Sequence, residues 1–145
     1  MTDPHNPGFE QGLAELPELL RSLARQYWVD IAPHLAGCAD SHWQTSAAKV
    51  LACSEFVLRT CQARPVLMVE VVTSGDLLRA YPDGHLSTRV HAALAGCDDE
   101  VALKRALRQV RQREMLRIAW RDLAGWASLE ETVRTLSALA DACLE

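Results

Sequence analysis

The residues best suited to chemistry are arginines gathered in one segment. Six of them fall between Arg105 and Arg121, where no Gly or Pro interrupts a helix. Guanidinium groups bind carboxylates and phosphates in bidentate geometry, so such a segment suits contact with an anion or an acidic surface. At 100° per residue an apolar line of this helix becomes charged halfway along it. The apolar part is Leu103, Leu107 and Val110, and the charged continuation is Glu114, Arg117 and Arg121.

We therefore take four residues as a candidate interface: Arg113, Glu114, Arg117 and Arg121. We expect these side chains to be exposed in this chain and to face an anion or a neighbouring domain. Two structural alternatives remain open. The helix could leave one packing neighbour for another where its apolar face rotates, or the arginines could form a solvated basic face.

The remaining residues that could do chemistry lack the necessary spacing. The five histidines show no metal-binding pattern, and His85 and His91 fall on different faces of a helix. Asp98 and Asp99 are adjacent and precede an expected helix, where capping explains them. Neither Gly-x-Gly nor Asp-x-Asp occurs. We expect no catalytic, cofactor-binding or metal-binding residue in this chain.

Composition limits the class of protein. The chain has 145 residues, 49% apolar residues and a formal net charge of −4, which fits one globular domain and disfavours binding of polyanions by the whole surface. Five cysteines without a C-x-x-C pair suggest reduced thiols packed as small hydrophobic groups in a cytoplasmic protein. We expect no signal peptide and no membrane span.

The elements that must position these residues are predicted to be helices. We expect a disordered tail over residues 1–10 and one helical domain over residues 11–145. Within it we expect helices near residues 13–33, 41–63 and 65–75, a short turn at 77–81, and helices near 86–95, 99–124 and 129–145. Pro65 and Gly75 flank the β-branched stretch 66–73 and favour a helix over a strand there.

Two polar patterns mark the last helices. Asp98 or Asp99 can cap the long helix, and Ser128 with Glu131 forms a capping box for the final one. The final helix keeps its apolar period to Glu145 without a terminating Gly, Asn or Pro. We therefore expect an all-α, irregular bundle of about five or six helices that is truncated at its C-terminus.

Several segments together resemble one family. The run Ser54-Glu55-Phe56-Val57 followed by Pro65, the Asp98-Asp99-Glu100 entry to the long helix, the stretch Arg111 to Trp120, and Ser137 to Asp141 occur in the family's order. They resemble the N-terminal helical region of the bifunctional enzyme that adenylylates and deadenylylates glutamine synthetase. Val110 stands where the family would suggest phenylalanine, and Gln112 where it would suggest arginine.

The resemblance implies that the catalytic motifs lie beyond this chain, in nucleotidyltransferase domains that use Mg²⁺ with ATP or ADP. It implies three partners: the rest of the parent enzyme, glutamine synthetase, and a signalling protein of the PII class. This piece would be a non-catalytic helical support or docking region that is inactive alone. The alternatives are a free-standing all-α adaptor that binds a protein through the arginine helix, and a small nucleic-acid binder.

Overall fold

The protein is all-α, as its sequence predicts. The computed structural model describes residues 6–38 and 42–145. These described residues form eight α-helices and two short 3₁₀ helices, with no strand among them. The expected count of five or six helices was too low because two of the expected helices are each divided. Residues 1–5 of the expected tail and Ser41, the expected start of the second helix, lie outside the described residues.

The first expected helix is two helices that meet at a proline. α1 (Pro7–Ala14) begins inside the expected tail, and α2 (Glu18–Ile31) continues into η1 (Ala32–Leu35). Pro17 lies within the single helix expected over residues 13–33, but its ψ of 146° is extended and it precedes α2 as the N-cap residue. Asn6 caps α1 by accepting a hydrogen bond from the Phe9 amide at 3.0 Å. The break lets α1 fold back beside α2.

The second expected helix is also divided, by a serine. α3 (His42–Cys53) stops before Ser54, and α4 (Glu55–Ala63) begins after it. Ser54 is extended, and its hydroxyl accepts the Val57 amide at 3.2 Å. This is the N-cap geometry that a serine side chain stabilises. α5 (Pro65–Thr73) confirms the helix expected between Pro65 and Gly75, and Gly75 adopts a φ of 78°.

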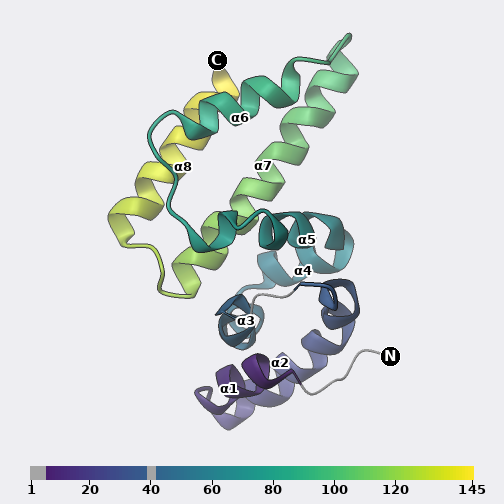
Figure 1. Cartoon of the computed structure of the whole chain (residues 1–145), viewed down its shortest axis with the longest axis vertical. Coiled ribbons are helices and arrows are strands. Elements are labelled where there is room, and N and C mark those ends of the chain that lie inside the picture. The colour runs from purple at the N-terminus through teal and green to yellow at the C-terminus, as the bar shows by residue number, and fades with distance from the viewer. Residues whose placement is uncertain (1–5, 39–41) are drawn as a thin grey trace.

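The C-terminal half follows the sequence expectations closely. η2 (Asp76–Leu78) is followed by α6 (His85–Leu94), α7 (Glu100–Leu123) and α8 (Leu129–Leu144). Asp99 caps α7, and Ser128 caps α8 by accepting the Glu131 amide at 3.1 Å. In Figure 1, α1 to α3 form one end of the molecule and α6 to α8 the other, with α4 and α5 between them. The long helix α7 runs from the far end down to α3.

Two hydrophobic cores meet on α7. The larger one holds buried residues from α1 to α5, with Leu116 and Trp120 from α7. Phe9 stacks on Trp28 in it, with ring centroids 4.3 Å apart. The smaller core consists of Leu86, Ile118 and Leu139, from α6, α7 and α8. No helix within residues 6–38 and 42–145 combines the length and apolarity needed to cross a bilayer.

Candidate functional site

The charged line of α7 is buried, which corrects the expectation that it is exposed. The exposed fractions of Arg113, Glu114, Arg117 and Arg121 are 4%, 0%, 1% and 4%. The apolar part of the same helix is less covered, since Leu103 is 38% exposed. The midpoint of α7 is therefore where η2, α5, α6 and α8 pack against it. We call these four residues, together with Asp76, the buried ionic cluster.

Asp76 is the acidic centre of this cluster. It lies in η2, directly after the left-handed Gly75, and is 1% exposed. Its carboxylate accepts hydrogen bonds from Arg79 at 2.6 Å, from Arg89 of α6 at 2.8 Å and from Arg113 of α7 at 2.7 Å. Burial alone would raise the pKa of Asp76, but the hydrogen bonds from Arg113 and Arg79 and the charge of Arg89 hold it well below its usual range.

Arg113 joins this carboxylate to two others. Its guanidinium also donates to Glu114 at 2.5 Å and to Glu70 of α5 at 3.1 Å. Burial favours the neutral form, but the bonds to Asp76 and Tyr81 outweigh it and raise the pKa of Arg113. Because a buried charge without a partner costs several kcal/mol, these contacts fix the position of α5 and η2 on α7.

Arg117 bonds to backbone rather than to carboxylates. Its Nε donates to the Asp76 carbonyl at 2.7 Å, and its Nη2 donates to the Arg79 carbonyl. The guanidinium carbon lies 3.5 Å from the centroid of the Tyr81 ring, a cation–π contact. Burial lowers the pKa of Arg117 from its ordinary value. Arg117 thus bonds to the carbonyl of the first residue of η2 and to that of the residue after its end.

Arg121 connects the cluster to α8. Its Nη1 donates to the Leu77 carbonyl at 3.1 Å, and its Nε donates to Glu131 at 3.1 Å. Glu131 is the residue whose amide is capped by Ser128, so one short segment holds both the start of α8 and its ion pair to α7.

Tyr81 and His85 close the side of the cluster that faces α6. The Tyr81 ring stacks on His85 with centroids 4.1 Å apart. Burial and the charge of Glu114 raise the pKa of Tyr81 to about 12. Burial and the neighbouring Arg89 lower the pKa of His85. Both effects favour neutral rings between the guanidinium groups.

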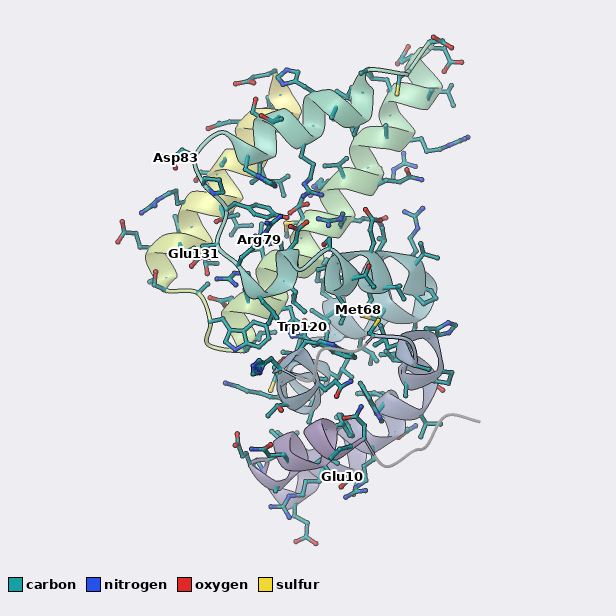
Figure 2. The ribbon with its side chains drawn as sticks, in the orientation of Figure 1. Glu10, Met68, Arg79, Asp83, Trp120 and Glu131 are labelled. Carbon is teal, nitrogen blue, oxygen red and sulfur yellow. The ribbon has the colours of Figure 1, made fainter. Side chains whose placement is uncertain are left out.

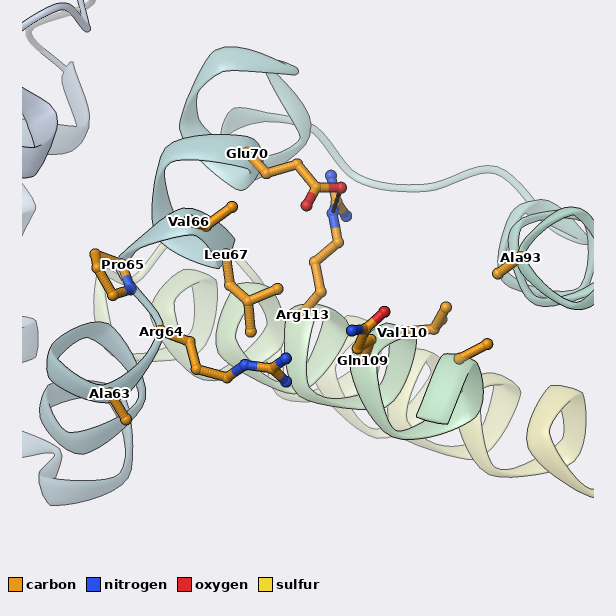
Figure 3. A pocket seen from close by; sticks show the side chains of 11 residues that line it. Ala63, Arg64, Pro65, Val66, Leu67, Glu70, Ala93, Gln109, Val110 and Arg113 are labelled. Carbon is orange, nitrogen blue, oxygen red and sulfur yellow. Dashed lines mark hydrogen bonds and ion pairs between the residues drawn. The ribbon is translucent and has the colours of Figure 1, made fainter. Parts of the chain in front are cut away.

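A hollow of about 570 Å³ opens beside the cluster, between α5, α6 and α7 (Figure 3). Val66 and Leu67 of α5 face Gln109 and Val110 of α7 across it, and Ala93 lines it from α6. The Glu70–Arg113 pair stands between Leu67 and Val110, and Arg64 also lines the hollow. The hollow is therefore lined by apolar side chains and by charged ones that already have partners, since Glu70 and Arg113 pair with each other and Arg64 donates to Gln112 at 2.5 Å.

The sequence missed most of the partners of the four predicted residues. Asp76 and Glu70 lie 37 and 43 positions before Arg113, beyond any helical spacing. One signal was available: Glu114, Arg117 and Arg121 continue the apolar line of α7, and residues that continue an apolar line on one face of a helix are candidates for burial.

The cluster is built to hold helices together. Its carboxylates and guanidinium groups are buried and bond to one another or to backbone carbonyls, so the geometry supports a structural role in holding the helices together. Trp120 extends this side of α7 into the larger core, where its indole nitrogen donates to Ser46 of α3 at 2.8 Å (Figure 2). The expected interface role of the four residues stays a prediction.

The other side chains considered for chemistry are metal ligands and cysteine thiols. Within residues 6–38 and 42–145, no three His, Cys, Asp or Glu side chains lie close enough together to hold a metal ion. All five cysteines are free thiols. The expectation that all five pack as buried hydrophobic groups was wrong for Cys53, which is exposed, while Cys61 is buried.

The fold and the cluster define an all-α module whose helices are held together by buried charged groups, and comparison with known proteins gives its family. The profile of the glutamate-ammonia ligase adenylyltransferase family matches residues 44–145. This range covers α3 to α8 and includes the whole buried ionic cluster. The chain belongs to this family.

Similar proteins carry a more specific name, bifunctional glutamine synthetase adenylyltransferase/adenylyl-removing enzyme. One from Thioalkalivibrio sulfidiphilus is 42% identical over 132 residues, which is 90% of this chain and 14% of that protein. One from Nitrosococcus oceani is 50% identical over 91 residues, covering 63% of this chain and 9% of that protein. One from Pseudomonas aeruginosa is 42% identical over 97 residues, covering 67% of this chain and 10% of that protein.

The T. sulfidiphilus relative matches most of this chain, but the chain spans only about one seventh of that relative's length. No solved structure matches the chain.

Proposed function

We propose that this chain is a non-catalytic helical support within a bifunctional glutamine synthetase adenylyltransferase/adenylyl-removing enzyme. The observation that carries the proposal is the buried ionic cluster. Its charged groups bond to one another, to carboxylates of α5 and α8, to Arg89 of α6 and to backbone carbonyls, and these contacts hold α5, η2, α6 and α8 on α7. Such a module is suited to rigid positioning of a neighbouring domain.

The chemistry is assigned to the rest of the parent enzyme. Transfer of AMP needs a metal held by carboxylates and a cradle for phosphates. We propose that the Mg²⁺ and the ATP or ADP used by the parent enzyme bind outside this chain. Glutamine synthetase and a PII-type signalling protein are the proposed protein partners, and the cytoplasm is the proposed location.

The test of inactivity uses the purified chain. Incubated with adenylylated glutamine synthetase, phosphate and Mg²⁺, it is expected to release no ADP above the blank. Release that disappears when a residue of this chain is changed would contradict the proposal.

The test of the supporting role uses the T. sulfidiphilus relative. Replacing its 132 matched residues with this chain is expected to preserve adenylyl removal, while deleting them is expected to abolish it. A deletion variant that remains fully active would show that the module supports nothing the reaction requires. Circular dichroism of both variants separates loss of support from general unfolding.

A further inference from the structure

Three arginines on the outer side of α7 have no bonding partner among the described residues. Arg105, Arg108 and Arg111 are exposed, and no hydrogen bond, ion pair or cation–π contact within residues 6–38 and 42–145 involves their side chains. Every other arginine of the chain bonds there to a carboxylate, an amide oxygen or a backbone carbonyl. We call Arg105, Arg108 and Arg111 the arginine row.

The arginine row lies on the face of α7 opposite the buried ionic cluster. At 100° per residue, Arg108 is about 180° around the helix from Arg117. Neighbours in the row are three positions apart, so each lies about 60° from the next. The outer two are about 9 Å apart along the axis, at about 1.5 Å per residue. α7 thus uses its inward arginines to hold its neighbours and presents the row on its outer side.

The arginine row concentrates positive charge that the chain does not neutralise. Like charges three positions apart on a helix repel one another and destabilise it. The carboxylates nearest to the row along α7 have other partners, since Glu100 pairs with Lys104 at 2.5 Å and the buried Glu114 accepts a hydrogen bond from Arg113. The whole chain has a formal net charge of −4, so the excess of cations is local. Carboxylates on a partner would relieve the repulsion and favour association.

The acidic start of α7 limits the length of that partner. Asp98, Asp99 and Glu100 are exposed. Glu100 lies about 7.5 Å along the axis from Arg105, within the Debye length of about 8 Å at physiological ionic strength. A polyanion that followed the helix beyond the row would therefore be repelled by these carboxylates.

α7 also lacks a surface on which bases could stack. Its one aromatic residue, Trp120, is 1% exposed and belongs to the larger core. Binding of single-stranded nucleic acids relies on exposed aromatic rings beside the basic groups. A short acidic segment of a protein therefore fits the arginine row better than a nucleic acid does.

A second copy of the chain fits the arginine row less well. A twofold interface on this face would bring the two rows together, or would set each row against the acidic start of the other α7. The first arrangement brings like charges together. In the second, Glu100 and Asp99 already bond within their own chain, which leaves Asp98 to face three guanidinium groups.

We propose that the arginine row docks an acidic helical segment of a protein partner, whose carboxylates lie along one face. Guanidinium groups bind carboxylates in bidentate geometry. A helix brings residues three or four positions apart to one face, which matches the spacing of the row. Docking on this face does not involve the buried ionic cluster, so it does not depend on the proposed supporting role.

The first experiment compares two acidic helical peptides of identical composition. One carries its glutamates three or four positions apart on a single face, and the other distributes them around the helix. Fluorescence anisotropy measures their binding to the chain at about 0.15 M salt. We expect the peptide with one acidic face to bind at least about fivefold more tightly. Equal binding of the two peptides, or binding of neither, overturns the proposal.

Two variants of equal net charge locate the binding. The row variant combines Arg105→Gln, Arg108→Gln and Arg111→Gln. The control variant combines Arg25→Gln, Arg59→Gln and Arg134→Gln, at side chains that are 54%, 76% and 64% exposed. We expect the row variant to bind the peptide with one acidic face at least about tenfold more weakly, and the control variant to stay within about twofold of wild type. Equal losses would show that only net charge matters and would overturn the assignment to the row.

The stability of the row variant tests whether the arginines are free for a partner. Removing like charges should leave the helical circular dichroism signal unchanged and the Tm unchanged or slightly higher. A row variant that unfolds would show that these arginines hold the structure together, and would overturn the proposal.

Competition and sedimentation test the other occupants. Single-stranded RNA or duplex DNA that displaces the peptide at a lower concentration than unlabelled peptide does would make a nucleic acid the partner. Self-association of the chain in sedimentation equilibrium, abolished in the row variant, would make a second copy the partner. Either result overturns the proposal. None of these measurements uses adenylyl removal, so their failure is distinguishable from failure of the supporting role.

Discussion

At the residue scale, Asp76 is the carboxylate that three guanidinium groups share. It is 1% exposed and accepts hydrogen bonds from Arg79, Arg89 and Arg113. A buried ion pair adds little when compared with apolar packing, but removing one partner leaves the other charge uncompensated. The cluster is therefore more sensitive to loss of one carboxylate than its number of contacts suggests.

We expect Asp76→Asn to lower the free energy of unfolding by about 3 kcal/mol, because it removes one of the two buried carboxylates, Asp76 and Glu114, that offset the charge of the buried arginines. Denaturant unfolding measures this. Glu55→Gln is the control, because its pair with Arg59 is 72% and 76% exposed and should contribute under about 1 kcal/mol.

The pH dependence of the Asp76 contribution has a fixed sign. Because folding lowers the pKa of Asp76, its ionised carboxylate stabilises the folded protein at pH values above about 3.9, the pKa of Asp in an unfolded chain. This stabilisation is lost as the pH falls toward the pKa of the folded state. The difference between wild type and Asp76→Asn should therefore narrow below about pH 4. A difference that stays constant would show that the carboxylate is not what the cluster depends on.

A second titration belongs to Cys61, whose thiol is 1% exposed. Burial raises its pKa to about 12, so the folded state keeps a proton that the unfolded state releases above about pH 8.5. Stability should fall with rising pH, by up to about 1.4 kcal/mol per pH unit from this group. Cys61→Val should reduce the slope of the unfolding free energy against pH that is measured between about pH 8.5 and 10.

At the element scale, short polar side chains determine where helices begin. Asp99 accepts the Ala102 amide at 2.7 Å and caps α7, although the sequence left Asp98 and Asp99 as equal candidates. We expect Asp99→Ala to destabilise the protein by about 1 kcal/mol, since it removes the partner of a free amide. Asp98→Ala should change stability by less than about 0.5 kcal/mol. Thermal melts of both variants make the comparison, and equal shifts would contradict the assignment.

The packing of α1 against α3 requires a glycine at position 12, because the two backbones lie too close for a Cβ atom there. A Cβ added at Gly12 would lie 2.0 Å from the carbonyl oxygen of Thr45. We expect Gly12→Ala to cost about 2–3 kcal/mol, because backbone must move to relieve the overlap. Gly96→Ala is the control, since a Cβ there meets nothing within 4 Å. A neutral Gly12→Ala, measured by denaturant unfolding, would show that α1 shifts without cost.

Local signals were enough to predict α5, α7 and α8, because each has its own cap or stop. They failed at Pro17 and Ser54, where the apolar period continues across a break that only the backbone geometry reveals. The prediction that the candidate site is exposed was wrong for another reason. The spacing identified Arg113, Arg117 and Arg121 as one face, but their burial depends on Asp76, whose contact with α7 is made by tertiary structure.

At the scale of the whole molecule, α7 is the element that the two cores share. Leu116 and Trp120 face the larger core, and Ile118 faces the smaller one. The larger core draws on six helices, while the smaller is three buried residues supported by the ionic cluster. The end of the molecule formed by α6 and α8 therefore rests on charged contacts more than the other end does.

This asymmetry predicts unequal protection of backbone amides. α3 buries five residues and α8 buries two, so α8 should open without global unfolding while α3 should not. Hydrogen exchange followed by mass spectrometry should show faster exchange in α8. Glu131→Gln removes the ion pair with Arg121 and should speed exchange in α8 while leaving α3 unchanged. Glu130→Gln is the control, because its pair with Arg134 is exposed and lies within α8. If α8 and α3 exchange at one rate in the wild type, the two cores unfold together, and the cluster joins them into one cooperative unit.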